Sequence, residues 1–492
     1  MPLSYLSDTQ RRKAPDLKRT DSKVHKLLFV GVATLLLATP IVSFAQAELQ
    51  AKDVTALSQS ASSEDARAVR RTRDNNVNTY AEYGAEGTFS LTWPVEAGVR
   101  VVSVKWNTLP DRDRVILVQS DENGNELSRG KIEQPIFNDC YAILPDARKL
   151  SLSCESGMQI SEVTLFSEGA LPEGVYDWQP PYEKADLLVV SAHCDDELIF
   201  FGGTIPYYAG ERKLAVQVVY MANADRARVD EALSGLWHAG VRHSPVFLPF
   251  KDVYTETLRL ALLNWGEKET TGELVGLIRR FQPDVIVSHD LEGEYGHGAH
   301  RATAYCLRQA VPLAADESAF PDSEAQYGAW QAKKLYLHLY PENQITMNWN
   351  QPLEAFGGKT ALEVANEAYH MHVSQLEYHK NVYGTGPYSS LLFGLVDSVV
   401  GQDAAKNDFF EHVPQTQPTD AAIPTATPSP AATAEAKMQT KMPEPTGTPG
   451  VSMLSKEQAQ QLRGITSLVF LVLGAGAAIA IKKQRDRKAN HK

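Results

Sequence analysis

The sequence of 492 residues predicts an α/β fold: a Rossmann-like, largely parallel sheet with flanking helices, preceded by an all-β sandwich. Two observations predict this architecture. Between residues 183 and 412, short β-branched or leucine-rich runs alternate with helical patterns, which is typical of right-handed βαβ units. Between about residues 79 and 166, several short β-branched runs are separated by turn residues, which is typical of a sandwich.

The N-terminal residues 1–47 have the features of a signal peptide. Residues 1–26 are polar and basic, and Leu27 to Phe44 form a nearly uncharged apolar run. Ala45-Gln46-Ala47 then fits a small-residue cleavage site. The apolar run is nearly long enough to span a membrane, so an uncleaved anchor is the alternative. In either case we expect the residues that follow to be exported.

Residues 48–168 contain the predicted sandwich. Its strands are expected at 99–106, 114–118 and 160–166, and a hairpin turn is expected at 121–125. The segment from about 79 to 166 loosely resembles galactose-binding-like (discoidin-type) domains. That resemblance implies glycan binding, and a structural spacer is the open alternative. Because the region is expected to be exported, Cys140 and Cys154 are predicted to form a disulfide.

The domain at 183–412 is expected to begin after a Pro/Gly-punctuated linker. Its predicted strands and helices follow one another along the chain, with strands at 187–190, 213–221, 245–250, 284–288 and 334–340, and helices at 228–239, 272–281 and 300–311.

Metal-capable side chains follow two of these strands. The run Leu187 to Ser191 ends in Ala192-His193-Cys194-Asp195-Asp196-Glu197, and a second run ends in His289-Asp290 with Glu294 to His300 beyond it. The carboxyl ends of parallel strands are where such folds bind ligands. His193, Asp196 and His300 make a nitrogen and oxygen set suited to Zn²⁺ with an open position, and Asp195 can act as a general base. Ordinary polar residues in loops are the alternative interpretation.

These motifs resemble those of the PIG-L (LmbE-like) zinc-dependent de-N-acetylases over about residues 183–380. Residues 192–197 resemble the AHPDDE motif, and Tyr295-Gly296-His297-Gly298-Ala299-His300 resembles the Tyr-Gly-His-Pro-Asp-His segment. The resemblance implies zinc ligands at His193, Asp196 and His300, and a base at Asp195. It implies that His297 and Tyr295 act on the oxyanion or the leaving amine, and that Arg228 contacts substrate. For Arg228, a salt bridge at the start of a helix is the open alternative.

Two positions depart from the family pattern. Cys194 replaces a proline, and Ala299 replaces the aspartate that would orient His297. A fourth zinc ligand or a nucleophile is an alternative reading of Cys194, but a neutral substitution is favoured, because the family motif supplies enough ligands without it. The second departure puts the role of His297 in doubt.

The C-terminal region has three parts. Residues 413–463 are rich in Pro, Thr and Ala and are predicted to be a disordered stalk. Residues 464–481 are apolar and uncharged, so a transmembrane helix is predicted. The basic residues of 482–492 place this tail in the cytoplasm by the positive-inside rule.

Together these features predict a single-pass cell-membrane protein with an extracellular, zinc-dependent deacetylase domain. Its expected partner is an N-acetylated amino sugar or glycan. The net charge of −12 argues against a nucleic-acid partner. A zinc amidase for a different N-acyl conjugate and a non-catalytic glycan-binding surface protein are the alternatives.

Overall fold

The computed structural model describes residues 49–61, 66–111 and 114–414. Outside these ranges lie the predicted signal peptide (1–47), transmembrane helix (464–481) and basic tail (482–492), together with the predicted stalk (413–463) beyond its first two residues. Within the described ranges, no helix is both long and apolar enough to cross a membrane.

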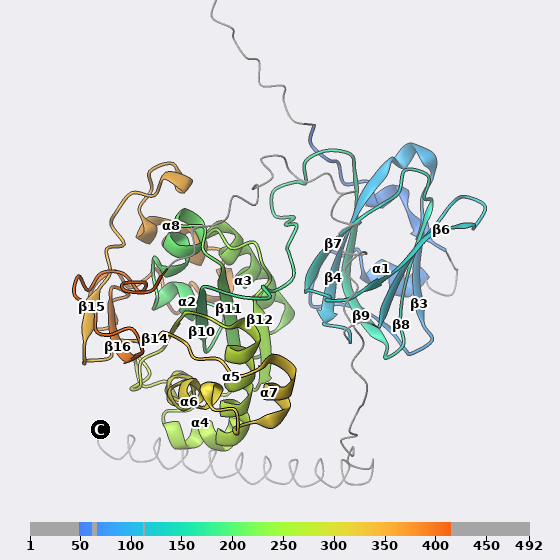
Figure 1. Ribbon diagram of the computed structural model, residues 1–492. Coiled ribbons are helices and arrows are strands. Elements are labelled where there is room, and N and C mark those ends of the chain that lie inside the picture. The colour runs from blue at the N-terminus through green and yellow to red at the C-terminus, as the bar shows by residue number, and fades with distance from the viewer. Residues whose placement is uncertain (1–48, 62–65, 112–113, 415–492) are drawn as a thin grey trace, which may run out of the picture. The chain divides into compact units, whose positions relative to one another are not determined.

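Nine of the described strands, between Gln59 and Ser167, form two antiparallel sheets (Figure 1). One sheet has the order β1-β3-β8-β5-β6 and the other has the order β2-β9-β4-β7. Apolar residues of both sheets, such as Phe89 and Leu165, meet in one buried core, so the sheets stack as a sandwich. The elements are η1 (Thr55–Leu57), β1 (Gln59–Ser60), α1 (Ala66–Arg71), β2 (Ala81–Tyr83), β3 (Thr88–Thr92), η2 (Val95–Ala97), β4 (Val99–Thr108), β5 (Val115–Ser120), β6 (Glu126–Ile132), β7 (Asn138–Ala142), β8 (Lys149–Cys154) and β9 (Met158–Ser167).

The predicted hairpin joins β5 to β6, which pair antiparallel. Its turn is held by Asp121, whose Oδ1 accepts hydrogen bonds from the backbone N–H groups of Asn123 (2.9 Å) and Asn125 (2.8 Å). Asp and Asn favour such turns because their side chains bond to the nearby backbone.

The predicted disulfide between Cys140 and Cys154 is wrong, since all four cysteines are thiols. Cys140 belongs to β7 of the four-stranded sheet and clusters with Val101 and Phe166. Its neighbour Tyr141 points into the sandwich core, so Cys140 points to the opposite face. Cys154 belongs to β8 of the other sheet and lies in the core. The two thiols therefore occupy different sheets and different hydrophobic clusters.

The remaining strands form one sheet of order β12-β11-β10-β13-β14-β16-β15. Strand β10 pairs in parallel with β11 on one side and β13 on the other, and β12 and β14 extend the parallel array. Strand β16 pairs antiparallel with β14 on one side and with β15 on the other. A largely parallel sheet was predicted correctly, whereas its antiparallel edge was not predicted. The strands are β10 (Leu187–Ser191), β11 (Val216–Ala222), β12 (Val246–Phe250), β13 (Val285–Ser288), β14 (Lys334–His338), β15 (Gln344–Thr346) and β16 (Leu392–Ser398).

Helices cover both faces of this sheet. On β10, Leu187 and Val189 belong to a cluster that includes residues of α3 and α8. The alternate residues Leu188 and Val190 belong to a second cluster with residues of α4, α5 and α6. Burial on both faces explains why the strand is apolar throughout its length. The helices are α2 (Asp196–Ile199), η3 (Pro206–Glu211), α3 (Arg226–His238), α4 (Leu258–Trp265), α5 (Glu267–Phe281), α6 (Gly298–Ala315), α7 (Pro321–Tyr327), η4 (Glu354–Phe356), α8 (Ala361–Tyr369) and η5 (Val373–Gln375).

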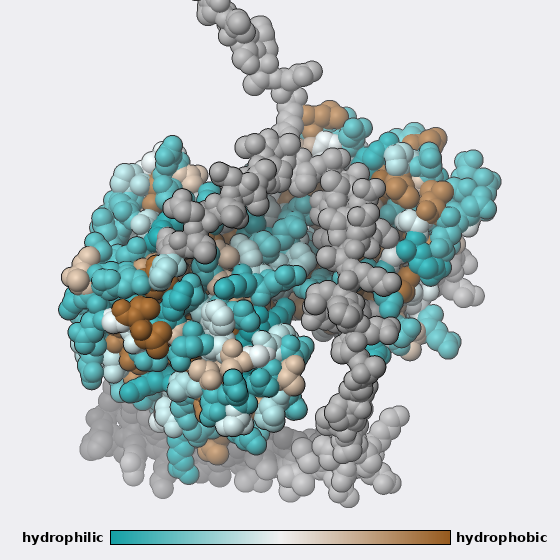
Figure 2. Space-filling model, viewed as in Figure 1, coloured by the Kyte–Doolittle hydropathy of each residue, from teal (hydrophilic) through white to brown (hydrophobic). Residues whose placement is uncertain are grey.

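Hydrophilic residues prevail on the visible surface of this region (Figure 2), as expected when two internal clusters take up the apolar side chains. The predicted helices are present but begin earlier than predicted. For example, α3 begins at Arg226 because Asp225 caps it, accepting the backbone N–H of Arg228 at 3.0 Å. The short helix α4 was not predicted.

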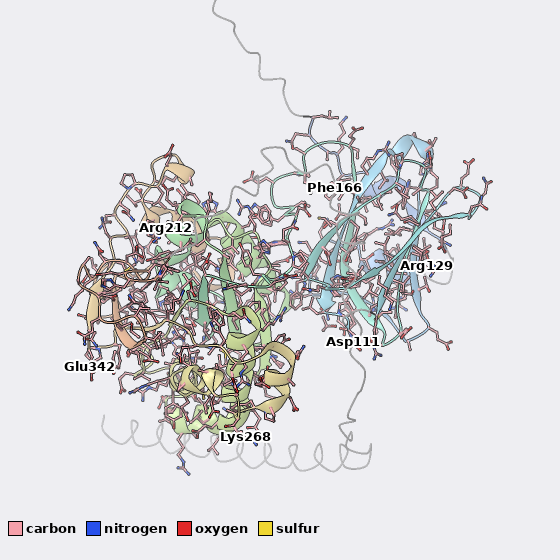
Figure 3. All side chains as sticks on the ribbon, in the orientation of Figure 1. Asp111, Arg129, Phe166, Arg212, Lys268 and Glu342 are labelled. Carbon is pink, nitrogen blue, oxygen red and sulfur yellow. The ribbon has the colours of Figure 1, made fainter. Side chains whose placement is uncertain are left out.

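The chain after β16 is tied back to the domain by polar contacts of Asp403 and Asp408. Arg212, labelled in Figure 3, pairs with Asp408 at 2.9 Å. Lys334 on β14 pairs with Asp403, and both groups are almost completely buried. The hydroxyl of Tyr336 donates to the second oxygen of Asp403 at 2.6 Å. These contacts make residues 403–408 part of the folded domain.

Candidate metal centre

The two predicted motifs lie beside each other because their strands are neighbours. Residues 193–196 directly follow β10, and residues 294–300 follow β13, which pairs in parallel with β10. The second segment includes the start of α6, which carries His300 into the domain. His193, Asp196 and His300 are all buried. The sheet order therefore brings the two clusters to one place.

Three donor atoms of these residues form a compact triangle. Nδ1 of His193 lies 2.9 Å from Oδ2 of Asp196 and 3.3 Å from Nε2 of His300. Nε2 of His300 lies 3.1 Å from the same Asp196 oxygen. With these sides, a point just outside the plane of the triangle is about 2 Å from all three atoms, which is the usual distance from zinc to nitrogen or oxygen ligands. The donor set therefore fits a zinc ion with three protein ligands.

The charges in this triangle are strongly coupled. Burial opposes the ionisation of Asp196, but His300 and His193 outweigh it and hold the pKa of Asp196 well below its ordinary value. Burial likewise opposes a charge on His300, but Asp196 and Glu294 raise its pKa to about 10. Since a metal ion and a proton compete for the same nitrogen, metal binding here releases a proton.

Asp195 lies close enough to the triangle for the charges of Asp196, His193 and His300 to affect its pKa. Its Oδ1 lies 3.3 Å from Nη2 of Arg228, and its side chain is almost fully buried. Burial and then the charge of Asp196 raise the pKa of Asp195 to about 6, although Arg228 acts in the opposite direction. A carboxylate with this pKa is ionised at neutral pH and is basic enough to accept a proton. Arg228 thus contacts the candidate base.

His297 is the N-cap of α6, and its Nδ1 accepts the backbone N–H of Ala299 at 3.2 Å. In the neutral ring the proton is therefore on Nε2. Burial, followed by the charges of His193 and His300, lowers the pKa of His297 to about 3. Its ring makes edge contacts with Tyr254 (centroids 5.0 Å apart) and Tyr295 (5.7 Å). His297 is thus placed beside the metal triangle as a neutral hydrogen-bond donor.

Tyr295 is 42% exposed, so its ring is accessible to a substrate. The rest of the Tyr295 side chain is buried. This burial, followed by the charges of Asp196 and Asp195, raises the pKa of Tyr295 above the ordinary value. The hydroxyl therefore stays protonated at neutral pH and can donate a hydrogen bond.

Sequence reasoning assigned no role to two carboxylates that back the metal-facing histidines. Oδ1 of Asp252 lies 3.5 Å from Nε2 of His193, and Oε2 of Glu294 lies 2.6 Å from Nδ1 of His300. Asp252 follows β12, so the rule that functional groups follow parallel strands could have found it. Glu294 lies inside the predicted second motif, but its contacts depend on how the loop folds.

Cys194 is buried in the hydrophobic cluster that includes Leu198 and Phe200. Burial has the largest effect on the pKa of Cys194 and raises it above the ordinary value of a thiol, although the charge of Arg228 acts in the opposite direction. In the described residues, two groups of side chains could hold a metal, His193, His297 and His300 in one and Asp196, His289 and His300 in the other, and Cys194 belongs to neither. These facts favour a neutral replacement for the proline of the motif.

Part of the chain is similar to known proteins. Residues 188–311 match the PIG-L family model, described as GlcNAc-PI de-N-acetylase.

A 1D-myo-inositol 2-acetamido-2-deoxy-alpha-D-glucopyranoside deacetylase of Catenulispora acidiphila is 28% identical over 206 residues, which cover 36% of this chain and 62% of the relative. The similarly named protein of Thermobifida fusca is 30% identical over 32% of this chain and 63% of the relative. The chain thus spans about three fifths of the length of these curated relatives. The N,N'-diacetylchitobiose deacetylase of Pyrococcus horikoshii gives a TM-score of 0.30 at 18% identity, over 42% of this chain and 78% of that one.

Proposed function

We propose that the α/β domain is a zinc-dependent hydrolase that removes N-acetyl groups from an amino sugar within a glycan or conjugate. The observation that carries the proposal is the triangle of His193, Asp196 and His300 with the Asp195 carboxylate beside it. The relatives' names support the substrate class, because they describe deacetylases of an acetamido sugar.

The chain's own residues supply the remaining chemistry. Zinc, when bound by the three ligands, polarises the acyl oxygen and makes water more acidic. Asp195 accepts the proton of the attacking water at its carboxylate, and Arg228 holds that carboxylate in place. His297 donates its Nε2–H to the oxyanion, and the Tyr295 hydroxyl adds a second donor or protonates the leaving nitrogen. Arg228 also has a partly exposed side chain that can contact the sugar.

The proposal includes a location. Export is supported by the basic N-terminal residues and the apolar run that follows them. A single anchor in the cell membrane is supported by the apolar run at 464–481 and the basic tail after it. The catalytic domain is then extracellular. A cell-surface or extracellular glycan therefore suits the site better than a cytosolic metabolite does.

The test is acetate release by the full chain, solubilised in detergent and loaded with zinc. Oligomers of N-acetylglucosamine and N-acetylated peptides are compared as substrates. The proposal expects acetate from the sugar oligomers at a rate abolished by a chelator and restored by zinc. Acetate from the peptides alone would favour the rival amidase. A protein that binds zinc but releases no acetate from any acetylated glycan would refute the proposal.

A further inference from the structure

One buried carboxylate collects hydrogen bonds from three imidazole rings. Oε2 of Glu294 lies 2.6 Å from Nδ1 of His300. Its other oxygen, Oε1, lies 3.1 Å from Nδ1 of His289 and 3.0 Å from Nδ1 of His338. The backbone N–H of Asp290 also donates to Oε1 at 3.1 Å. The three rings are fully buried, and the carboxylate is shielded from solvent.

The partners on the far side of each ring define where the protons are. Nε2 of His289 accepts the backbone N–H of Ala192 at 2.8 Å, so its proton is on Nδ1 and is donated to Glu294. Nε2 of His338 lies 3.1 Å from the carbonyl oxygen of Ser389. Nδ1 of His338 can therefore donate to Glu294. All three rings can thus donate to the one carboxylate.

The same arrangement selects the nitrogen that His300 presents to the metal. With Nδ1–H donated to Glu294, the lone pair of His300 is on Nε2, and Nε2 is the atom 3.1 Å from Asp196 and 3.3 Å from His193. The network also ties the ends of three strands together, because Ala192 follows β10, His289 follows β13 and His338 ends β14.

The backbone at Glu294 is in an unusual conformation. Its φ is +50°, in the left-handed region that side-chain-bearing residues seldom adopt. The preceding Gly293 also has a positive φ, and a Cβ there would lie 2.5 Å from the carbonyl oxygen of His297. Such conformations persist where surrounding contacts enforce them, often at functional sites. Here the turn directs the carboxylate inward, toward the three rings.

We infer that Glu294 is a positioning residue of the metal centre: it fixes the ring and proton of His300 so that Nε2 faces the ion. This inference shares with the proposed function only the assumption that His193, Asp196 and His300 bind the metal. Carboxylates that hold a ligating histidine in this way typically improve metal affinity 10–100-fold.

The experiment measures zinc affinity by chelator competition on the full chain, without substrate. In Glu294→Gln the side chain keeps its shape, but its amide nitrogen must face an imidazole N–H. We expect zinc to bind ~10–100-fold more weakly. Glu294→Asp is shorter by one methylene and cannot reach all three rings, so we expect a loss of similar size. In the cobalt-substituted protein, a changed visible absorption spectrum would show that the ligand geometry has altered.

Asp403→Asn is the matched control, because it also neutralises a buried carboxylate with a buried cationic partner in this domain. It should lower the melting temperature and leave zinc affinity and the cobalt spectrum unchanged. Zinc affinity within twofold of wild type in a folded Glu294→Gln protein would overturn the inference. So would an equal loss in the control, or failure of both Glu294 variants to fold, since either result assigns Glu294 to the fold alone. A protein that binds zinc tightly yet deacetylates nothing would refute the proposed function and leave this inference intact.

Discussion

The backbone N–H of Ala299 donates a hydrogen bond to Nδ1 of His297 across 3.2 Å. The PIG-L pattern has an aspartate at this place that would orient the ring, but this chain has Ala299 instead, so the sequence left the orientation of His297 open. Here the first turn of α6 orients it instead, because a helix N-terminus has N–H groups without partners inside the helix. The ring is therefore held as a neutral donor, and this has a consequence for catalysis that can be tested.

Replacing His297 by Ala should leave zinc affinity unchanged and lower turnover ~10²–10³-fold, the usual effect of removing one oxyanion donor. Because the pKa of His297 is lowered to about 3, the ring needs no added proton between pH 5 and 8. The measurement is acetate release against pH for both proteins. An alkaline decline in wild type that disappears in His297→Ala would show that the ring acts as a charged acid, contrary to this prediction.

The neighbouring aspartates should differ in what they do. Asp195→Asn keeps the side-chain volume but removes the proton acceptor, so zinc should stay bound while turnover falls by ~10²–10⁴. Asp196→Ala removes a ligand, so zinc content and turnover should fall together, as they should in His300→Ala. Zinc content is measured beside the rate of acetate release. Loss of zinc in Asp195→Asn, or near-normal turnover, would refute this division of roles.

The sandwich should lose stability as the pH rises toward neutrality. Burial, and then the nearby carboxylate of Asp74, raise the pKa of Glu162 from 4.5 to about 7, against a hydrogen bond from Asn76. Since the folded pKa is above the unfolded one, the folded state binds more protons between these two values. The contribution of Glu162 to stability is therefore present below pH 4.5 and is lost as the pH rises through about 7.

Thermal unfolding of the full chain from pH 4.5 to 7.5 tests this contribution. Glu162→Gln should flatten the fall in melting temperature, because the amide does not titrate. Glu82→Gln, a change at an exposed glutamate on β2, is the control and should keep the wild-type profile. Identical profiles for all three proteins would show that Glu162 does not titrate as described.

The predicted membrane topology can be tested on intact cells. Residues 48–463 are predicted to be outside, so added protease should remove the folded domains and leave a small C-terminal fragment. A tag at the C-terminus should stay protected until the cells are permeabilised. Complete protection of the whole chain in intact cells would rule out this orientation.

The sequence predicted those features of the site that depend on residues close together along the chain. A strand that ends in a His-and-Asp run predicts functional groups at the carboxyl end of a sheet, and the structure places His193, Asp196 and His300 together there. Glu294 could not be predicted in the same way, because its contacts with His289 and His338 arise only when three separate strand ends meet. A carboxylate in a loop carries no sign of such partners.

The errors in the fold have the same origin. Cys140 and Cys154 are 14 residues apart along the chain, yet their strands belong to different sheets. Strand β16 follows β15 only after a long segment that contains α8, so nothing in its own sequence indicates that it pairs antiparallel with β14. Local patterns predicted which segments are strands better than they predicted the strands' partners.

The position of β16 bears on how short the domain can be made. The family match ends at residue 311, but β16 and β15 cover the side of β14 that faces away from β13. A chain ending before Leu392 would leave the N–H and C=O groups of β14 unpaired along that side. An open strand of this kind is a template for pairing with another molecule. The C-terminal strands thus protect the α/β domain from self-association, and a truncation made at the end of the family match is expected to aggregate.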